Sequence, residues 1–357
     1  YLLDEAQLRR NGEILLGVQQ RTGCKMLLAQ KAFSNFDLYP LLAPYLAGTE
    51  ASGLYESRLG REELPQKENH VFCAAYRVDE FAELLHYADH VVFNSPAQLA
   101  KFGPAAKAAG KSVGLRINPE CSTQEGHAIY DPCAPGSRLG TTRAQWDAAL
   151  EKQPGLSSLL DGLHFHTLCE QDADALALTL DAVEAKFGSL LPGLKWLNFG
   201  GGHHITRPGY ALPTLEACIT RMQEKYGVQV YLEPGEAWAL NAGYLVTTVL
   251  DTLHNGSTSL AILPHPGRHR DALPPASAGR RGAGRKERHR PPRRADLPRR
   301  RCRGRLQLRR PSDRGRQAPF RRYGHLHHLQ EQYLQRDASA THLDADRGRH
   351  LPGAGAV

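Results

Sequence analysis

The stretch KMLLAQKAFSN, Lys25 to Asn35, decides how this chain is interpreted. It begins as a short apolar run, which predicts a buried strand that ends on Lys31. A lysine at the end of a buried strand is costly unless its amine is used or reaches water. Three roles are open for this amine: a Schiff base with a carbonyl group, an ion pair, or a carbamylated bridge between metal ions.

Further short apolar runs follow, and helical patterns separate most of them. Strands that alternate with helices predict parallel strands and right-handed connections. An open doubly wound sheet is the alternative, but it usually has a glycine-rich turn after its first strand, and none follows Lys31. Eight strand–helix units in roughly 230 residues match a (β/α)8 barrel, so we predict an α/β protein with a TIM-like barrel over residues 1–240. The later runs are GTEASG (48–53), HVFCAAY (70–76), HVVFNS (90–95), SVGLRIN (112–118), DGLHFHT (161–167), LKWLNFG (194–200) and VQVYLEP (228–234).

Residues with catalytic potential occur where these predicted strands end. In a barrel of this type the C-terminal ends of the strands form the active-site rim. We therefore expect one rim to carry Lys31, Glu56, Arg116, His166, Gly200 to Gly202, and Glu233.

Three consecutive glycines, Gly200 to Gly202, follow the seventh predicted strand in WLNFGGGHH. Glycines let the backbone approach an anion and direct successive N–H groups toward it. The loops after strands seven and eight are the usual phosphate site of this fold. A simple flexible turn is the alternative, and the position in the strand order favours phosphate.

His164 and His166 are two residues apart on a predicted strand and so share one face. A metal pair, with His203 and His204 close in the sequence, is one interpretation. A ring stacked on an aromatic cofactor is a second, and ordinary hydrogen-bonded histidines are a third. A convincing set of carboxylate ligands is missing for the metal interpretation.

Two acids lie in LEPGEA at the end of the eighth predicted strand. Glu233 is suited to pair with a protonated ring nitrogen, or it caps a loop. Glu236 is suited to a cationic substrate, or it faces solvent. Arg138, in the long loop PGSRLG, either holds a phosphate or carboxylate or is solvated.

Taken together, the lysine on strand one, FH on strand six, GGG and EPG resemble the pyridoxal-phosphate decarboxylases of the alanine racemase and ornithine decarboxylase fold type. More specific stretches are similar to the carboxynorspermidine/carboxyspermidine decarboxylases, and they span nearly all of residues 1–263. These stretches are LLAQKAFS, GLYESRLG, LRINPE, SRLG, GLHFHTLCE, NFGGGHHIT and YGVQVYLEPGEA.

This resemblance implies a pyridoxal 5'-phosphate site. Lys31 would form a Schiff base with the cofactor, and His166 would stack on its pyridine ring. Glu233 would pair with the pyridinium nitrogen, and Gly200 to Gly202 would bind the phosphate. Arg116 would lie near the lysine end of the cofactor.

The resemblance also implies a substrate and a partner. Glu56 would lie near the lysine end of the site, and Glu236 would help to bind the positive charges of a polyamine. The reaction would convert carboxynorspermidine or carboxyspermidine to norspermidine or spermidine. The family implies a homodimer whose partner subunit supplies a Cys–Asp pair. Other barrel decarboxylases or racemases, acting on diaminopimelate, ornithine or alanine, and a metal-dependent barrel hydrolase are the alternatives.

The charge of the chain divides sharply near Leu263. Residues 264–357 contain 24 Lys and Arg against 8 Asp and Glu, whereas residues 1–263 contain 21 against 29. Residues 241–263 resemble the first strands of the family's C-terminal β domain, and there the resemblance stops. Arg, Pro, Ala and Gly are what GC-rich codons produce in the wrong frame, so we interpret residues 264–357 as a frame-shifted reading of that domain.

A basic nucleic-acid-binding tail is one rival interpretation, but no RGG-like repeat is visible, so nucleic acid is an unexpected partner. A genuine domain is the other, and the composition argues against it. A chain with a frame-shifted C-terminal domain would lack the partner-supplied residues and have little activity. Seven scattered cysteines without a CxxC motif favour a reducing cytoplasm. No apolar run reaches the roughly 20 residues that cross a membrane.

Overall fold

The computed structural model describes residues 1–124, 131–263 and 318–321. Most of the predicted frame-shifted tail, residues 264–317 and 322–357, therefore lies outside the described residues. The described residues form two compact units. Leu3–Ala242 make up the larger unit, and Tyr1–Leu2 with the strands from Gly243 onward make up the smaller one.

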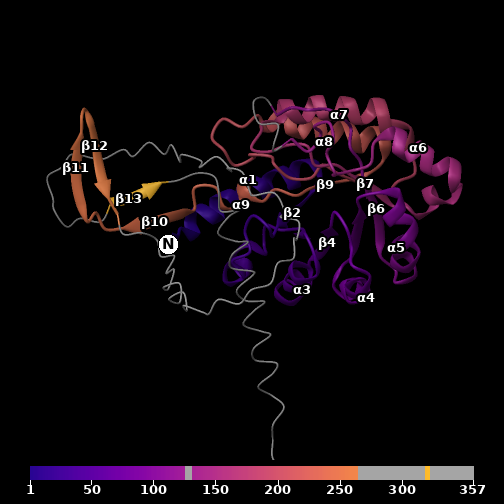
Figure 1. The fold of residues 1–357 in the computed structure, drawn as a ribbon, viewed down its shortest axis with the longest axis horizontal. Helices are drawn as coiled ribbons and strands as arrows, with labels where there is room; N and C mark the ends of the chain where they lie inside the picture. The colour runs from indigo at the N-terminus through magenta and orange to yellow at the C-terminus, as the bar shows by residue number, and fades with distance from the viewer. Residues whose placement is uncertain (125–130, 264–317, 322–357) are drawn as a thin grey trace, which may run out of the picture. The chain divides into compact units, whose positions relative to one another are not determined.

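Eight parallel strands close into a barrel in the order of the sequence, which confirms the predicted (β/α)8 fold (Figure 1). Each strand coincides with one of the short apolar runs. The pairing closes between the first and last strands, where Lys25 lies opposite Tyr231. The strands are β2 (Lys25–Ala29), β3 (Gly48–Ala51), β4 (Glu68–Phe72), β5 (His90–Phe93), β6 (Ser112–Arg116), β7 (Gly162–His164), β8 (Trp196–Asn198) and β9 (Gln229–Leu232).

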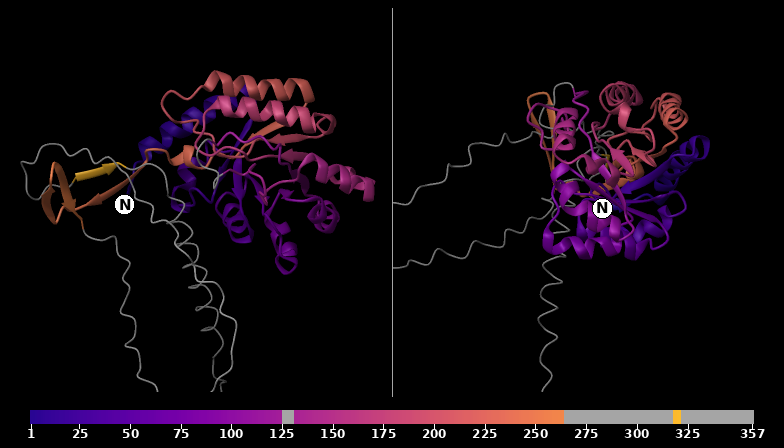
Figure 2. Two further views of the ribbon diagram at one scale, coloured as in Figure 1. Left: turned by 45° about the horizontal axis from the view of Figure 1, so that its top comes forward. Right: turned by 90° about the vertical axis from the view of Figure 1, so that its right-hand side faces the viewer.

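Helices connect these strands and lie on the outside of the barrel (Figure 2). Local sequence fixes several of their ends. Asp4 caps α1 by accepting a hydrogen bond from the Gln7 N–H at 3.1 Å, and Gly23 ends that helix with a φ of 70°. The helices are α1 (Glu5–Thr22), α2 (Tyr39–Leu42), α3 (Leu54–Glu63), α4 (Val78–Tyr87), α5 (Pro96–Ala108), α6 (Arg143–Lys152), α7 (Ala173–Phe187), α8 (Leu212–Tyr226) and α9 (Glu236–Ala239), with 3-10 turns η1 (Phe36–Leu38), η3 (Pro154–Leu159) and η4 (Gly188–Leu190).

Trp196 fills the middle of the barrel. Its indole lies against Gly114 and Gly162, which face it from β6 and β7. A Cβ atom added at Gly114 or Gly162 would lie 2.2 Å or 2.0 Å from the indole ring. The indole N–H donates to the Ser112 hydroxyl at 2.8 Å. These two glycines therefore make the space that a residue as large as tryptophan needs inside a small barrel.

A polar cluster occupies the N-terminal half of the barrel interior. The Lys25 ammonium pairs with one oxygen of Glu68, and the other oxygen lies 3.0 Å from His70 Nε2. The rings of His70 and His90 stack with their centroids 3.8 Å apart. Burial, together with the neighbouring His70, lowers the pKa of His90 to about 2. Because Lys25, Glu68 and His90 begin their strands, this cluster lies at the opposite end of the barrel from the predicted active-site rim.

The smaller unit contains two short sheets. Strands β1 (Leu2–Leu3), β10 (Gly243–Thr247) and β13 (Ala318–Arg321) form one, in the order β1-β10-β13. Strands β11 (Asp251–Asn255) and β12 (Thr258–Ile262) form an antiparallel hairpin. Across the described ranges of the chain, no helix has both the length and the apolar character that a membrane span requires.

Candidate active site

Lys31 lies just beyond the end of β2. The predicted strand reached Lys31, whereas the observed strand ends at Ala29 and the chain turns over the next three residues. The side chain of Gln30 is buried in this turn and donates to the Glu56 carbonyl at 2.9 Å. The positive charge of Lys31 acts on the pKa values of several groups, which identifies them as its neighbours: Glu50, Glu56, His164, His166 and Glu233.

Glu233 follows β9 and is held in a buried hydrogen-bond network. One carboxylate oxygen accepts from the Asn198 amide at 2.6 Å, and the other lies 3.1 Å from His164 Nε2. Burial disfavours the charged carboxylate, but the His164 ring and the charge of Lys31 outweigh burial and hold the pKa of Glu233 well below its usual range. The site therefore contains a buried, ionised carboxylate whose orientation is fixed from two strands.

Arg116 ends β6 and lies deep in the rim with 5% of its surface exposed. Its guanidinium donates to the His166 carbonyl at 3.1 Å and lies 4.5 Å from the centre of the Phe72 ring. Burial lowers the pKa of Arg116 to about 10, while Glu233 and Glu50 act in the opposite direction. Arg116 therefore stays charged at neutral pH and balances the acids around it.

His166 lies directly against the glycine loop. Its Nδ1 accepts a hydrogen bond from the Gly201 N–H at 3.2 Å, so Nδ1 carries no proton in this arrangement. Burial, with the charges of Lys31 and Arg116, holds the pKa of His166 well below its usual range. The ring is therefore a neutral, flat group at neutral pH.

The glycine loop itself is packed between the ends of β7 and β9. A Cβ atom added at Gly200 would lie 2.3 Å from the Phe165 carbonyl oxygen, and one at Gly201 would lie 2.5 Å from the Glu233 carbonyl oxygen. Gly200 and Gly202 also adopt positive φ angles of 69° and 84°. Larger residues would collide with backbone here, so the loop requires glycine for space as well as conformation.

Glu50 is a rim residue that sequence reasoning missed. It lies in β3, is 2% exposed, and one of its oxygens has no hydrogen-bond partner among the described residues. Burial raises the pKa of Glu50 above its usual range, and the Glu233 charge adds to the effect while Lys31 opposes it. The sequence feature that could have identified Glu50 is its position inside a predicted buried strand. An ionisable group in a buried strand needs a charged neighbour.

Glu56 lies in the first turn of α3, just past β3 as expected. Its carboxylate accepts a hydrogen bond from the Ser52 N–H at 2.6 Å, which holds it beside the rim. Burial raises the pKa of Glu56, and Lys31 opposes that shift. The structure therefore brings Lys31 together with two acids, Glu50 and Glu56, of which the sequence indicated one.

Glu236 begins α9 and forms an acidic cluster with two residues from neighbouring loops. Its carboxylate lies 3.0 Å from His204 Nε2. Ligand-type atoms of Glu170, His204 and Glu236 lie within 4.8 Å of one another. Glu170 is exposed and adopts a positive φ of 55°, which is uncommon outside glycine. Two carboxylates on one imidazole make this part of the rim attractive to cations.

The metal interpretation of His164 and His166 finds no support in the described residues. His164 is hydrogen-bonded to Glu233, and His166 accepts a hydrogen bond from the Gly201 N–H, so each ring already has a protein partner. Burial lowers the pKa of His203 to about 4. Arg138 is exposed, and its charge acts on Arg116 from the long loop. Among the described residues, the groups with metal-like spacing are instead Glu68, His70 and His90, and Glu170, His204 and Glu236.

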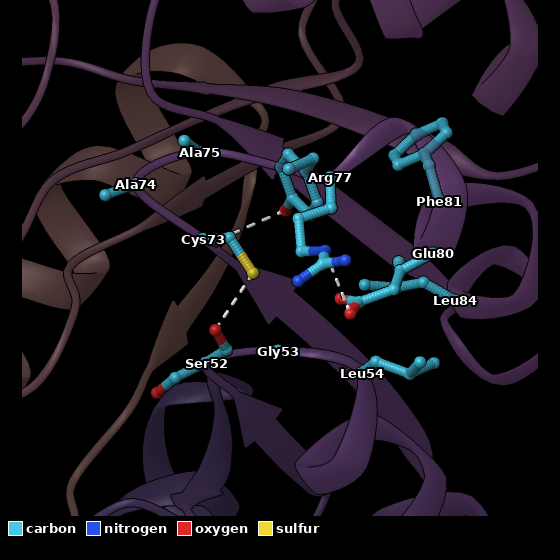
Figure 3. Close-up of a pocket in the computed structure, with 11 residues that line it drawn as sticks. Ser52, Gly53, Leu54, Cys73, Ala74, Ala75, Arg77, Glu80, Phe81 and Leu84 are labelled. Atoms are coloured by element: carbon cyan, nitrogen blue, oxygen red, sulfur yellow. Dashed lines mark hydrogen bonds and ion pairs between the residues drawn. The ribbon is translucent and has the colours of Figure 1, made fainter.

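A pocket of about 310 Å3 is lined by residues that follow β3 and β4 and by residues of α4 (Figure 3). Its wall includes Ser52 and Cys73, from the loops after β3 and β4, and the Cys73 thiol donates to the Ser52 carbonyl at 2.9 Å. Burial raises the pKa of Cys73 to about 12, and Glu50 and Glu56 add to the rise. The Cys73 thiol therefore lines this pocket and stays protonated at neutral pH.

Comparison with known proteins gives consistent relatives, although no family model matches the chain. The chain is 41% identical over 263 residues to the carboxynorspermidine/carboxyspermidine decarboxylase of Campylobacter jejuni, covering 74% of this chain and 66% of that protein. It is 37% identical to the carboxyaminopropylagmatine decarboxylase of Synechocystis, with the same two coverages. It is 35% identical to the carboxynorspermidine/carboxyspermidine decarboxylase of Herminiimonas arsenicoxydans, covering 74% and 69%.

A solved structure agrees with these relatives. The carboxynorspermidine decarboxylase from Campylobacter jejuni, complexed with norspermidine, superposes with a TM-score of 0.64 at 40% identity, covering 74% of this chain and 66% of that one. The chain thus spans about two thirds of the length of the relatives it matches, and just under that for the first two. On the identity and coverage of these matches, the chain belongs to the family of carboxynorspermidine/carboxyspermidine decarboxylases.

Proposed function

We propose that this chain binds pyridoxal 5'-phosphate and that its barrel is built to decarboxylate carboxynorspermidine or carboxyspermidine. The observation that carries this proposal is the buried, ionised Glu233 on the same rim as Lys31. A buried carboxylate of this kind needs a cationic partner, and a protonated pyridine nitrogen is such a partner. His164 and Asn198 already fix its orientation.

The residues present fit the cofactor. The glycine loop offers a backbone cradle that any Cβ would fill, which suits close approach of a phosphate. One oxygen of Glu50 is buried without a partner among the described residues, on the side of the site where Lys31 lies. The neutral imidazole of His166 accepts a hydrogen bond from the loop, and the His166 carbonyl accepts one from Arg116. The glycine loop, the amine of Lys31 and the carboxylate of Glu233 thus follow different strands of the same rim.

The chemistry divides between the cofactor and the chain. When bound, pyridoxal phosphate supplies the electron sink that accepts the electron pair of the broken Cα–carboxylate bond. In our proposal Lys31 provides the amine that binds the cofactor's aldehyde. Glu233 keeps a proton on the ring nitrogen, and His166 supports the flat face of the ring. Arg116 stays protonated and fixes the backbone of His166.

The acidic cluster of Glu170, His204 and Glu236 supports a polyamine substrate. A carboxylated polyamine carries ammonium groups some distance from the carbon that loses carbon dioxide. Carboxylates at the rim attract such groups, and Glu236 is held in place by His204. A guanidinium-ended substrate, like that named for the Synechocystis relative, would meet the same carboxylates. An assay should therefore compare substrates that differ in the group farthest from the carboxylate that is lost, with an ammonium in one and a guanidinium in the other.

Borohydride trapping tests the cofactor proposal. The full chain is incubated with pyridoxal phosphate, reduced, digested and mapped by mass spectrometry. The expected result is a yellow protein whose reduced cofactor is attached to Lys31. Lys31→Ala should abolish both, whereas the matched control Lys111→Ala should retain both. Attachment at another lysine, or the absence of any attachment, would overturn the proposal.

We also propose that residues 264–357 derive from a shifted reading frame. The aligned length of 263 residues in the Campylobacter jejuni comparison equals the length of the chain before Pro264, which supports this proposal. Resequencing the gene at the Leu263 codon tests it directly, and an intact frame would refute it. A frame-restored chain should decarboxylate carboxynorspermidine or carboxyspermidine at least 100-fold faster than this chain. Faster turnover of diaminopimelate or a carboxylated agmatine derivative would refute the proposed substrate class.

A further inference from the structure

Two cysteines in the segment that follows β6 are drawn together by Asp131. One oxygen of Asp131 accepts a hydrogen bond from the Ser122 hydroxyl, and the other accepts from the Cys133 N–H at 2.8 Å. Cys121 precedes Ser122 directly. The carboxylate therefore joins the two ends of the segment and brings the backbone of Cys121 next to that of Cys133.

Cys121 also acts directly on the thiol of Cys133. Burial raises the pKa of Cys133 to about 11, and a hydrogen bond from the Cys121 N–H opposes that rise. The sulfur of Cys133 therefore lies within hydrogen-bond reach of the Cys121 backbone. The Cys121 thiol donates to the Leu178 carbonyl at 3.9 Å, and both cysteines are partly exposed and reduced in the described structure.

We propose that Cys121 and Cys133 form a redox pair that closes reversibly into an intramolecular disulfide when hydrogen peroxide is the oxidant. Disulfide formation requires Cα atoms about 4.4–6.8 Å apart and side chains that turn toward each other. The Asp131 bridge and the contact between the Cys133 sulfur and the Cys121 N–H bring the two residues together. Closure also requires the Cys121 side chain to rotate away from the Leu178 carbonyl.

The step balances as a two-electron oxidation. The Cys121 thiolate attacks one oxygen of peroxide, the O–O bond breaks, and a sulfenic acid and hydroxide form. The Cys133 sulfur then attacks the sulfenic sulfur, the S–O bond breaks, and the second oxygen leaves as hydroxide. The two thiol protons convert both hydroxides to water, so two thiols and one peroxide give one disulfide and two waters.

Cys121 is the better candidate for the first attack. The thiolate is the nucleophile, and the ammonium of Lys186 favours the thiolate of Cys121, although burial still raises the pKa of that thiol. Cys133 is less suited because its pKa reaches about 11. Cys133 also acts on the pKa of Arg116, so the pair adjoins the active-site rim.

Peptide mapping tests the pair directly. The full chain is treated with one equivalent of peroxide, blocked with a maleimide under denaturing conditions and digested with trypsin. Residues 117–138 have no internal Lys or Arg and form one tryptic peptide with only these two cysteines. We expect this peptide to lose both maleimide labels and two hydrogen atoms, and dithiothreitol to restore both labels. The reaction should speed up about tenfold from pH 7 to pH 8, because thiolate rises tenfold per pH unit below the thiol pKa.

Serine variants complete the test. In Cys133→Ser, dimedone should trap a sulfenic acid at Cys121, and neither Cys121→Ser nor Cys133→Ser should form the internal disulfide. Cys169→Ser is the matched control, because Cys169 is an exposed thiol in the loop after β7, and it should cross-link like the wild type. Oxidation of Cys169 or Cys73 while both labels remain on peptide 117–138 would overturn the proposal. Because no cofactor or substrate is needed, this outcome is independent of the proposed decarboxylase function.

Discussion

Gly202→Ala provides the most informative single test of the glycine loop. A Cβ at Gly202 would lie 2.0 Å from the Leu168 carbonyl oxygen, and real Cβ contacts essentially never fall below 3.0 Å. The loop must therefore shift by about 1 Å, which is enough to break one charge-assisted hydrogen bond to a bound phosphate, worth about 1.5–3 kcal/mol. The Kd for pyridoxal phosphate should rise about 10- to 150-fold.

Gly209→Ala is the matched control. Gly209 has nearly the same φ, 80° against 84° for Gly202, but a Cβ there would meet nothing within 4 Å. Both variants carry the cost of a left-handed alanine, about 1–2 kcal/mol, so the difference between them isolates the collision with Leu168.

Cofactor affinity is read by absorbance titration, and folding by circular dichroism and urea denaturation. Pyridoxal, which lacks the phosphate, is titrated in parallel. Gly202→Ala should weaken binding of pyridoxal phosphate and leave that of pyridoxal nearly unchanged, while Gly209→Ala should change neither. Equal weakening of both ligands in a folded Gly202→Ala protein would refute the assignment of phosphate to this loop.

Three further predictions concern the barrel and the rim. Gly162→Ala should lower the free energy of unfolding, measured by urea denaturation, by about 2–3 kcal/mol because its Cβ would collide with Trp196. In a Trp196→Ala background the same substitution should cost much less, because the colliding indole is gone. Burial lowers the pKa of His90 from 6.5 to about 2, so only the unfolded chain takes up a proton at His90 as the pH falls from 7 to 5. The free energy of unfolding of the wild type should therefore fall by about 2 kcal/mol more over this range than that of His90→Asn. If the pH dependence is unchanged, His90 is not the acid-sensitive group. Glu236→Gln in the frame-restored chain should raise KM for a carboxylated polyamine about fivefold with little change in kcat, and a fall in kcat alone would contradict a role in substrate binding.

The barrel was predictable because each buried strand is a short apolar run between helical patterns. The positions of Arg116 and Glu233 followed from the same count, since a residue at a strand end belongs to the rim. The end of β2 was predicted two residues too late. The predicted strand ran to Lys31, but pairing stops at Ala29, whose partner in β3 is Glu50, and the polar residues Gln30 and Lys31 lie in the turn.

Other parts of the site depend on contacts between distant segments. Glu50 was overlooked because only strand register shows that it shares the interior with Glu233. His164 and His166 suggested a metal because their spacing on the predicted strand puts them on one face, but the partner of each ring comes from another strand or loop. The proximity of Cys121 and Cys133 has no periodic signal, since Asp131 creates it.

Trp196 has a consequence for the support of the rim. The indole lies across β6 and β7 one inward-facing position below Arg116 and His164, and only 2% of its surface is exposed. It therefore forms the packed layer of the barrel interior directly beneath the rim. Arg116 and His164 rest on this layer, so a change at Trp196 would reach the rim through the loss of support beneath these two side chains.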